Sequence, residues 1–279
     1  MTAVLLALGA AVGWGCSDFL GGLQARRRSL ATVLAVSLPS GLLVLVPLIA
    51  VRGDGPPSTL RIVYGVLAGV TGVAGISALY RGLSLGTMGV FAPISATAPL
   101  VPLGVGLARG ERPSPLQLLG MGLALIGIVA AGREPAAAAQ GTRFALGVGF
   151  AMGAAASFGV SLVCFDAAAA GDPYWATLVV RLVGTAFALV LLVAVRPSLP
   201  GRSVTLLVLV AVGVLDATAT TSFSIATTRG LLSVVSVLAS LFPVVVVLLA
   251  RTFLGEQPAR TQLAGAVTAV SGVALISAG

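Results

Sequence analysis

The stretch GTMGVFAPISATAPLVPLGVGLARGERPSPLQLLGMGLALIG, residues 86–127, returns in altered form at residues 230–272 as GLLSVVSVLASLFPVVVVLLARTFLGEQPARTQLAGAVTAVSG. The offset is 144 residues (230 minus 86) and becomes 145 after a one-residue insertion. Matched positions are Gly86 with Gly230, Val90 with Val234, Pro99 with Pro243, Glu111 with Glu256, and Gln117 with Gln262. The chain is therefore one unit written twice.

The composition indicates a membrane protein. Apolar residues make up 58% of the chain and charged residues only 9%, which a soluble domain of this length could not hide from water. All basic residues are arginine, and most stand between apolar runs. They form no basic helix face interleaved with aromatic residues, so we expect no nucleic-acid partner but contact with the lipid bilayer.

Ten apolar segments approach the length of about 20 residues that a helix needs to cross a bilayer. Within a few residues they are 3–23, 30–51, 60–80, 87–108, 115–131, 144–165, 174–195, 204–227, 231–254 and 261–277. An odd number of crossings in each copy inverts the second copy relative to the first. We therefore predict an all-α integral membrane protein with ten transmembrane helices, arranged as two inverted five-helix repeats around a central cavity. The predicted boundaries are 1–131 and 143–279, with a linker at 132–142.

Several short motifs occur in a characteristic order. Trp14-Gly15 in the first segment is echoed by Phe158-Gly159, prolines interrupt segments four and nine, and Leu254-Gly255-Glu256 precedes a last segment with spaced glycines. In this order the chain resembles the EamA family of the drug/metabolite transporter superfamily. The resemblance covers almost the whole chain. It implies a ten-helix carrier with a central cavity that exports amino acids, other metabolites or drugs, and it implies cytoplasmic termini.

Orientation has two conflicting indications. Most loop arginines lie on the side of the membrane opposite to the termini, so the positive-inside rule favours termini outside the cell. The resemblance implies the reverse. In either orientation we expect a multi-pass protein of the bacterial cytoplasmic (inner) membrane.

Asp216 is the first candidate site residue. It lies about 12 residues into its segment, roughly 18 Å along a helix and so near the bilayer midplane. Thr220, Ser224 and Thr227 follow at helical spacing and form one polar stripe with it. We predict that Asp216, Thr220 and Ser224 line the cavity, because ionisable groups at this depth are usually functional. The alternative is that the hydroxyls bond their own helix and Asp216 only joins two helices.

Arg181 lies about 10 Å deep in the preceding segment. Because the two segments are consecutive and antiparallel, its side chain can reach Asp216, and a salt bridge would ease the desolvation of both ions. Such a pair, once opened, would suit a zwitterionic substrate. The alternative is that Arg181 extends to the nearer interface.

Trp14 and Asp18 are four residues apart and share a helix face. Trp14 could form an aromatic wall for the substrate or simply pack between helices. Asp18 lies near the arginine triplet at 26–28, so it could line the cavity or form an interfacial ion pair.

Pro99 and Pro243 occupy equivalent positions in segments four and nine. Each removes a backbone donor and bends its helix, so we interpret both as mechanical elements beside the cavity, either hinges or fixed kinks. Glu111 and Glu256 precede segments five and ten, where a carboxylate would cap the following helix.

These features predict a secondary transporter that moves a small metabolite, an amino acid or similar solute, by alternating access, with export as the expected direction. Alternatives are a proton-coupled exporter of amphiphilic cations and a non-transporting scaffold. The chain has no His, no metal-ligand spacing and no nucleophile beside a base, so we expect no enzyme activity, metal or cofactor. Ten spans can enclose a cavity, so we expect a monomer.

Overall fold

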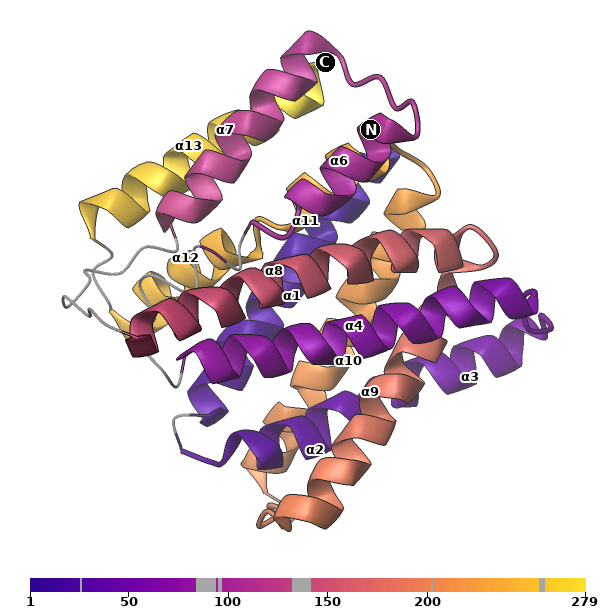
Figure 1. Ribbon diagram of the computed structural model, residues 1–279. Coiled ribbons are helices and arrows are strands. Elements are labelled where there is room, and N and C mark those ends of the chain that lie inside the picture. The colour runs from indigo at the N-terminus through magenta and orange to yellow at the C-terminus, as the bar shows by residue number, and fades with distance from the viewer. Residues whose placement is uncertain (26, 84–93, 95–96, 132–141, 202, 256–258) are drawn as a thin grey trace.

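The computed structural model describes residues 1–279 apart from 26, 84–93, 95–96, 132–141, 202 and 256–258. All regular secondary structure in the described residues is helical (Figure 1). The helices are α1 (Thr2–Ala25), α2 (Leu30–Ser40), α3 (Leu42–Arg52), α4 (Thr59–Leu83), α6 (Leu100–Ala108), α7 (Pro115–Ala131), α8 (Thr142–Ala169), α9 (Pro173–Val195), α10 (Val204–Thr227), α11 (Leu232–Ala239), α12 (Phe242–Leu254) and α13 (Arg260–Ala278).

The predicted all-helical membrane architecture is confirmed, whereas the number of ten spans is not established. Eight described segments are long and apolar enough to cross a bilayer, and α7 is a shorter apolar helix of 17 residues. Of the predicted fourth span, the structure describes α6 and little that precedes it. The predicted linker 132–142 lies almost wholly outside the described residues.

Two of the predicted spans are divided helices. The second consists of α2 and α3 with Gly41 between them, and the ninth consists of α11 and α12 with a turn at Ser240 and Leu241. A long apolar run fixes the presence of a span but does not show where the backbone hydrogen-bond ladder stops.

Local sequence signals explain where some helices begin. The Asp172 carboxylate accepts hydrogen bonds from the backbone N–H groups of Tyr174 and Trp175, at 2.8 and 2.9 Å. Pro173, which has no N–H to satisfy, takes the first position of α9. Aspartate before proline thus starts the helix that carries Arg181.

The contacts between helices follow the internal repeat: a contact between two helices recurs between their counterparts in the other copy. Helix α1 packs against α10 as α8 packs against α4, and α2 contacts α10 as α9 contacts α4. Other pairs join equivalent helices, namely α2 with α9 and α7 with α13, and α6 contacts α11 across the repeats. Figure 1 shows α4 beside α8 across the middle and α7 beside α13 at one edge.

Individual contacts obey the same symmetry. Ser17 donates to the carbonyl of Val212 at 3.0 Å, and Ser161, 144 residues later, donates to the carbonyl of Ala68 at 2.7 Å. Ala68 and Val212 are themselves 144 residues apart. Such a match at the level of single hydrogen bonds indicates that both copies fold alike and pack about a twofold axis.

The direction of the helices shows that the second copy is inverted. Contacts of Gly13 with Ala219 and of Ser17 with Val212 make α1 antiparallel to α10. The contacts made by the glycines of α4 show that this helix runs parallel to α9 and antiparallel to α8. Because α9 and α10 are consecutive and antiparallel, α1 and its counterpart α8 run in opposite directions.

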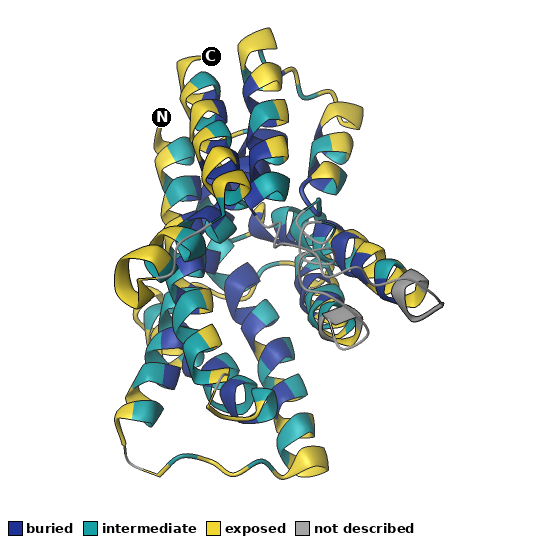
Figure 2. Ribbon diagram, turned by 90° about the vertical axis from the view of Figure 1, so that its left-hand side faces the viewer, coloured by how far each residue is buried: buried dark blue, intermediate teal, exposed yellow. Residues whose placement is uncertain are grey.

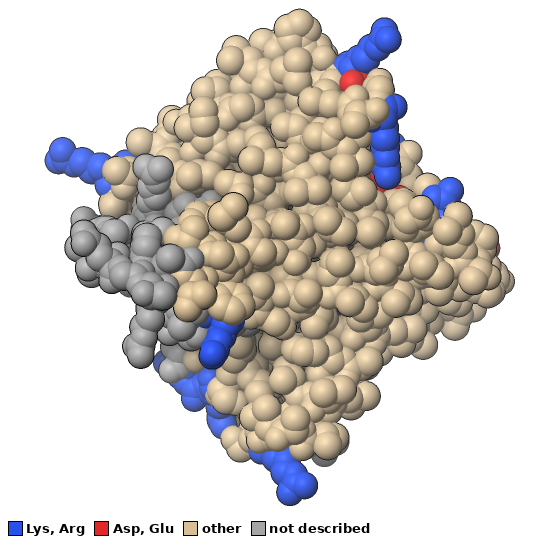
Figure 3. Space-filling model, viewed as in Figure 1, with Lys and Arg blue, Asp and Glu red and all other residues tan. Residues whose placement is uncertain are grey.

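The outer surface suits a bilayer. Across the face in Figure 3, charged side chains stand at the margin and the middle is uncharged. Buried residues gather where helices face one another (Figure 2). Small residues permit the closest approach: a Cβ on Gly127 of α7 would lie 2.3 Å from the backbone nitrogen of Ala269 on α13.

Candidate functional site

The predicted ion pair between Arg181 and Asp216 is present. An Nη1 atom of Arg181 on α9 contacts an Oδ2 atom of Asp216 on α10. The Arg181 side chain is only 7% exposed, whereas that of Asp216 is 30% exposed. A buried guanidinium without a partner would be strongly unfavourable. Asp216 therefore stabilises the charge of Arg181 and still presents part of its carboxylate to open space.

The hydroxyl of Thr220 joins three helices at this point. It accepts hydrogen bonds from Nη2 of Arg181 at 2.7 Å and from Nε1 of Trp14 at 3.2 Å, and it donates to the Asp216 carbonyl at 2.7 Å. Its one donor and two acceptor positions are all used. Thr220 thus holds Arg181 and Trp14 in place rather than presenting a free group to a ligand.

Asp18 brings a second carboxyl group to the site. Its carboxyl group interacts electrostatically with that of Asp216. Asp18 is exposed, and no hydrogen bond or ion pair joins it to another described residue. Because the Asp216 side chain is itself partly exposed, both carboxyl groups face open space. The sequence offered no sign of this carboxylate pair, because Asp18 and Asp216 are far apart in the chain.

Burial along α1 shows where that space begins. One face of the helix carries residues spaced by three or four positions: Ala7, Ala11, Trp14, Asp18, Gly22 and Ala25. Ala7 and Ala11 are fully or almost fully buried, whereas Asp18, Gly22 and Ala25 are exposed. The same face is therefore packed in its first half and open in its second half, and Asp18 lies where this change occurs.

The open face of α1 lies between two helices. On one flank, Ser17 and Gly21 contact Val212 of α10. On the other flank, Phe19 lies against Phe253 of α12, with ring centroids 6.2 Å apart. Asp18 projects from the strip between these flanks.

Trp14 belongs to an aromatic cluster next to the carboxylates. Its ring centroid is 5.6 Å from Phe223 on α10 and 6.4 Å from Phe242 on α12, the latter edge to face. Phe223 in turn stacks on Phe165 of α8 at 5.9 Å. Trp14 is half-buried, while Phe223 and Phe165 are buried. The cluster therefore provides an apolar surface next to Asp18, on the packed side of α1.

Ser224 takes a different position from the one predicted. Its hydroxyl donates to the Pro173 carbonyl at 3.0 Å, and the residue has no exposed surface. In this conformation it joins α10 to the start of α9. The predicted polar stripe therefore faces open space only at Asp216, since Thr220 is buried and bonded within the protein.

The two predicted hinge prolines lie at the starts of α6 and α12. Pro99 precedes the first residue of α6, and Pro243 lies in the first turn of α12. The two positions are similar, because Pro99 ends the turn at residues 97–99 and Pro243 closely follows the turn at Ser240 and Leu241. Proline is tolerated there because the first turn of a helix has N–H groups without intrahelical partners.

The sequence predicted that Glu111 caps the helix that follows it, but the structure shows a different contact. Its carboxylate accepts hydrogen bonds from the backbone N–H groups of Leu232 and Ser233, at 2.8 and 3.1 Å. It therefore caps α11 of the other repeat. Glu256 lies outside the described residues.

Sequence reasoning also missed Gly41. A Cβ there would lie 2.9 Å from Cβ of Ala217 and 3.1 Å from Cδ of Arg181. Only glycine lets the α2–α3 junction approach the ion pair so closely. A lone glycine in an apolar segment gives no signal of this role.

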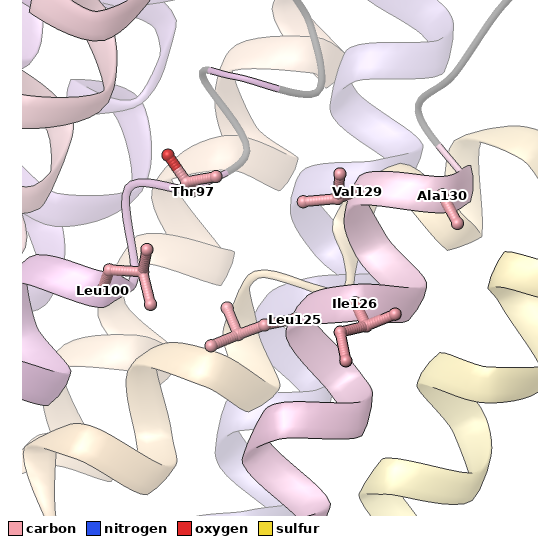
Figure 4. A pocket seen from close by; sticks show the side chains of 6 residues that line it. All are labelled: Thr97, Leu100, Leu125, Ile126, Val129 and Ala130. Atoms are coloured by element: carbon pink, nitrogen blue, oxygen red, sulfur yellow. The ribbon is translucent and has the colours of Figure 1, made fainter.

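A separate apolar groove of about 340 Å³ lies between α6 and α7 (Figure 4). Its lining residues are Thr97, Leu100, Leu125, Ile126, Val129 and Ala130. None of them is charged and none is a predicted site residue. Within the described part of the chain, no three His, Cys, Asp or Glu side chains gather as metal ligands would.

Comparison with known proteins agrees with this architecture. A model of the EamA-like transporter family matches residues 1–133 and again residues 145–278. The chain belongs to the EamA-like transporter family. It is therefore a multi-pass membrane transporter of the drug/metabolite type and not an enzyme. The two matches also agree with the twofold packing of the EamA repeats described above.

Solved structures support the same fold. One crystal structure, described only as that of a protein, superposes with a TM-score of 0.82 over 98% of this chain and 94% of its own, at 20% identity. At this identity the likeness concerns the fold alone. No curated protein sequence matches this EamA chain.

Proposed function

We propose that this protein is a secondary carrier for a small organic solute with a positively charged amine, which binds between Asp18 and Asp216 and crosses the membrane by alternating access. The observation that carries the proposal is the pair of carboxyl groups beside a single buried guanidinium. Arg181 is paired with Asp216, whereas no described residue forms an ion pair with Asp18. A carboxylate in a membrane interior requires a compensating cation or a proton.

The adjoining aromatic rings fit the same class of substrate. The faces of Trp and Phe attract cations, and their apolar surface accommodates the hydrocarbon part of an amine. Trp14 stands one helical turn from Asp18 and is half-buried. When the amine leaves, a proton on the carboxyl pair would replace its charge, so exchange of amine for proton is part of the proposal.

An amino acid is the second candidate. The Nε atom of Arg181 is buried and has no hydrogen-bond partner. If the pair with Asp216 opened, the guanidinium could receive the carboxylate of a zwitterion while Asp18 received its ammonium group. We further propose that the protein works as a monomer in a bacterial cytoplasmic membrane and exports its substrate.

Thermal unfolding of the purified protein in detergent tests the site. The panel contains amines, lipophilic cations, amino acids, nucleosides and sugars, each added to the wild type and to the Asp18→Asn and Asp216→Asn variants. A ligand at about 100 times its Kd stabilises the folded state by about 2.7 kcal/mol. We expect a shift with amine-bearing compounds that both variants lose.

Asp54→Asn is the matched control, because Asp54 is an exposed surface carboxylate paired with Arg52. It should keep the shift. A shift produced by sugars or nucleosides, or one retained in both site variants, would contradict an amine site at Asp18 and Asp216.

A further inference from the structure

Burial changes abruptly along the ninth span. All eight residues of α11 are buried, whereas only Val244 is buried in α12. The change coincides with that along α1, whose inner face is packed up to Trp14 and open from Asp18 onward. Both helices begin at the same end of the molecule, since Ala3 lies beside Gly230 just before α11.

This end also holds Gly279, the residue after α13, because Gly279 lies against Ser114 just before α7. Figure 1 shows the two chain ends near each other. We call it the chain-end side, and the side that carries residues 27–29 and 196–201 the opposite side. Among the described residues, the inner face of α1 is thus packed on the chain-end side of the carboxylates and open on the opposite side.

Polar contacts between the repeats close the chain-end side. Glu111 of the first repeat binds the first two backbone N–H groups of α11 in the second. In the same turn, Nη1 of Arg109 pairs with Oδ2 of Asp166 at 3.2 Å. A second pair between the repeats joins Arg52 to Asp172 at 2.8 Å. Both ion pairs between the repeats that the structure describes lie on this side.

The equivalent positions on the opposite side cannot form these pairs. The repeat places Leu254 where the first copy has Arg109, and Gly22 where the second has Asp166. Likewise Arg196 corresponds to Arg52, and Arg28 corresponds to Asp172. On the opposite side, two uncharged residues thus stand in place of the Arg109–Asp166 pair, and two arginines stand in place of the Arg52–Asp172 pair. Among the described residues, ion pairs between the repeats therefore favour closure on the chain-end side.

Helix α11 contains two buried hydroxyl groups that have no hydrogen-bond partner. Ser233 and Ser236 have no exposed surface, and their Oγ atoms make no hydrogen bond. They are three residues apart and so lie on one face of the helix. Buried hydroxyls are normally bonded, because desolvation without a partner is unfavourable. Water would satisfy both if α11 faced an open passage.

We propose that α11 is the gate on the chain-end side, held shut by the Glu111 cap and the Arg109–Asp166 pair, and that Ser233 and Ser236 line the substrate passage when it opens. The proposal rests on the carrier function proposed above. In an inverted-repeat carrier, the passage on one side opens as that on the other side closes. The bonds of Glu111 and Arg109 favour the closed gate, and the unbonded hydroxyls oppose it, so the two states are kept close in free energy.

Thiol labelling in reconstituted vesicles tests the gate without any substrate. Cys16 and Cys164 are first replaced by alanine. A single cysteine is then placed in the gate by Ser236→Cys, or on the open side by Gly22→Cys, where nothing lies within 4 Å of the added Cβ. A membrane-impermeant maleimide is added to either side of the vesicles, and the labelling rates are compared.

We expect Ser236→Cys to react slowly in the otherwise unaltered protein. Arg109→Asp or Glu111→Gln should raise its rate from the chain-end side about fivefold and lower the rate of Gly22→Cys from the opposite side. Exchange of the charges in the Arg109→Asp/Asp166→Arg double variant should restore the original rates. Arg112→Gln is the matched control and should change neither rate, because Arg112 lies in the same turn and forms no ion pair with a described residue.

Unchanged rates in the variants would overturn the gate, and so would rates that rise together at both positions, because that result indicates loosening of the fold. These outcomes are independent of the carrier proposal, which fails instead if the ligand panel shows no amine binding at the carboxylates.

Discussion

Thr220→Val removes the hydroxyl that joins α1, α9 and α10 and leaves a side chain of nearly the same shape. The substitution leaves Nη2 of Arg181 and Nε1 of Trp14 without their acceptor. An interhelical hydrogen bond in a membrane protein contributes about 0.6 kcal/mol on average and up to about 1.7 kcal/mol. The bond from Arg181 is short, buried and charged, which places it at the upper end.

The two bonds together predict a loss of about 2 kcal/mol in the free energy of unfolding, a factor of about 30 in the equilibrium. For a chain of this size the melting temperature should fall by about 4–8 °C. Thermal unfolding in detergent, followed by intrinsic tryptophan fluorescence, measures the change. Trp14→Phe should lose the smaller part, because it removes the longer and uncharged bond.

Thr221→Val is the matched control, because the Thr221 hydroxyl donates only to the Ala217 carbonyl of its own helix. It should shift the melting temperature by no more than about 1 °C, since it leaves no interhelical donor unpaired. Equal shifts for Thr220→Val and Thr221→Val would refute the assignment of Thr220 as the residue that holds the site together.

Two further predictions concern the twofold packing, and thermal unfolding measures both. Ser17→Ala and Ser161→Ala each remove one interhelical bond at equivalent positions, so each should lower stability by about 1 kcal/mol; a difference of more than about 1 kcal/mol would contradict equivalence of the repeats. Gly127→Ala should lower the melting temperature because its Cβ would lie 2.3 Å from the Ala269 nitrogen, whereas Gly122→Ala, with nothing within 4 Å, should be neutral or stabilising by up to about 1 kcal/mol. Equal effects of the two glycine variants would show that α7 and α13 are not closely packed.

The fold was largely readable from the sequence, since membrane spans depend on local composition. A run of about 20 apolar residues must form a helix in a bilayer, because no water is present to satisfy its backbone. The observed bounds of α7 and α10 agree with the predicted segments 115–131 and 204–227. The break between α11 and α12 was not predicted, because turns inside apolar runs carry no compositional signal.

The candidate site could be predicted only in part from the sequence. Depth along consecutive helices predicted the pair of Arg181 and Asp216, because their separation follows from helix geometry. The contact of Glu111 with α11 and the approach of Asp18 to Asp216 were not predicted. Each joins residues more than a hundred positions apart, so neither can be derived from rise per residue.

By itself the sequence determined that the chain is a duplicated, helical membrane protein, because hydrophobicity and internal repetition are properties of the chain alone. The tertiary structure decided which side of each helix is packed and which is open. That depends on how neighbouring helices cover a face, and it is the reason that Asp18 is accessible while Ser224, predicted beside Asp216, is enclosed.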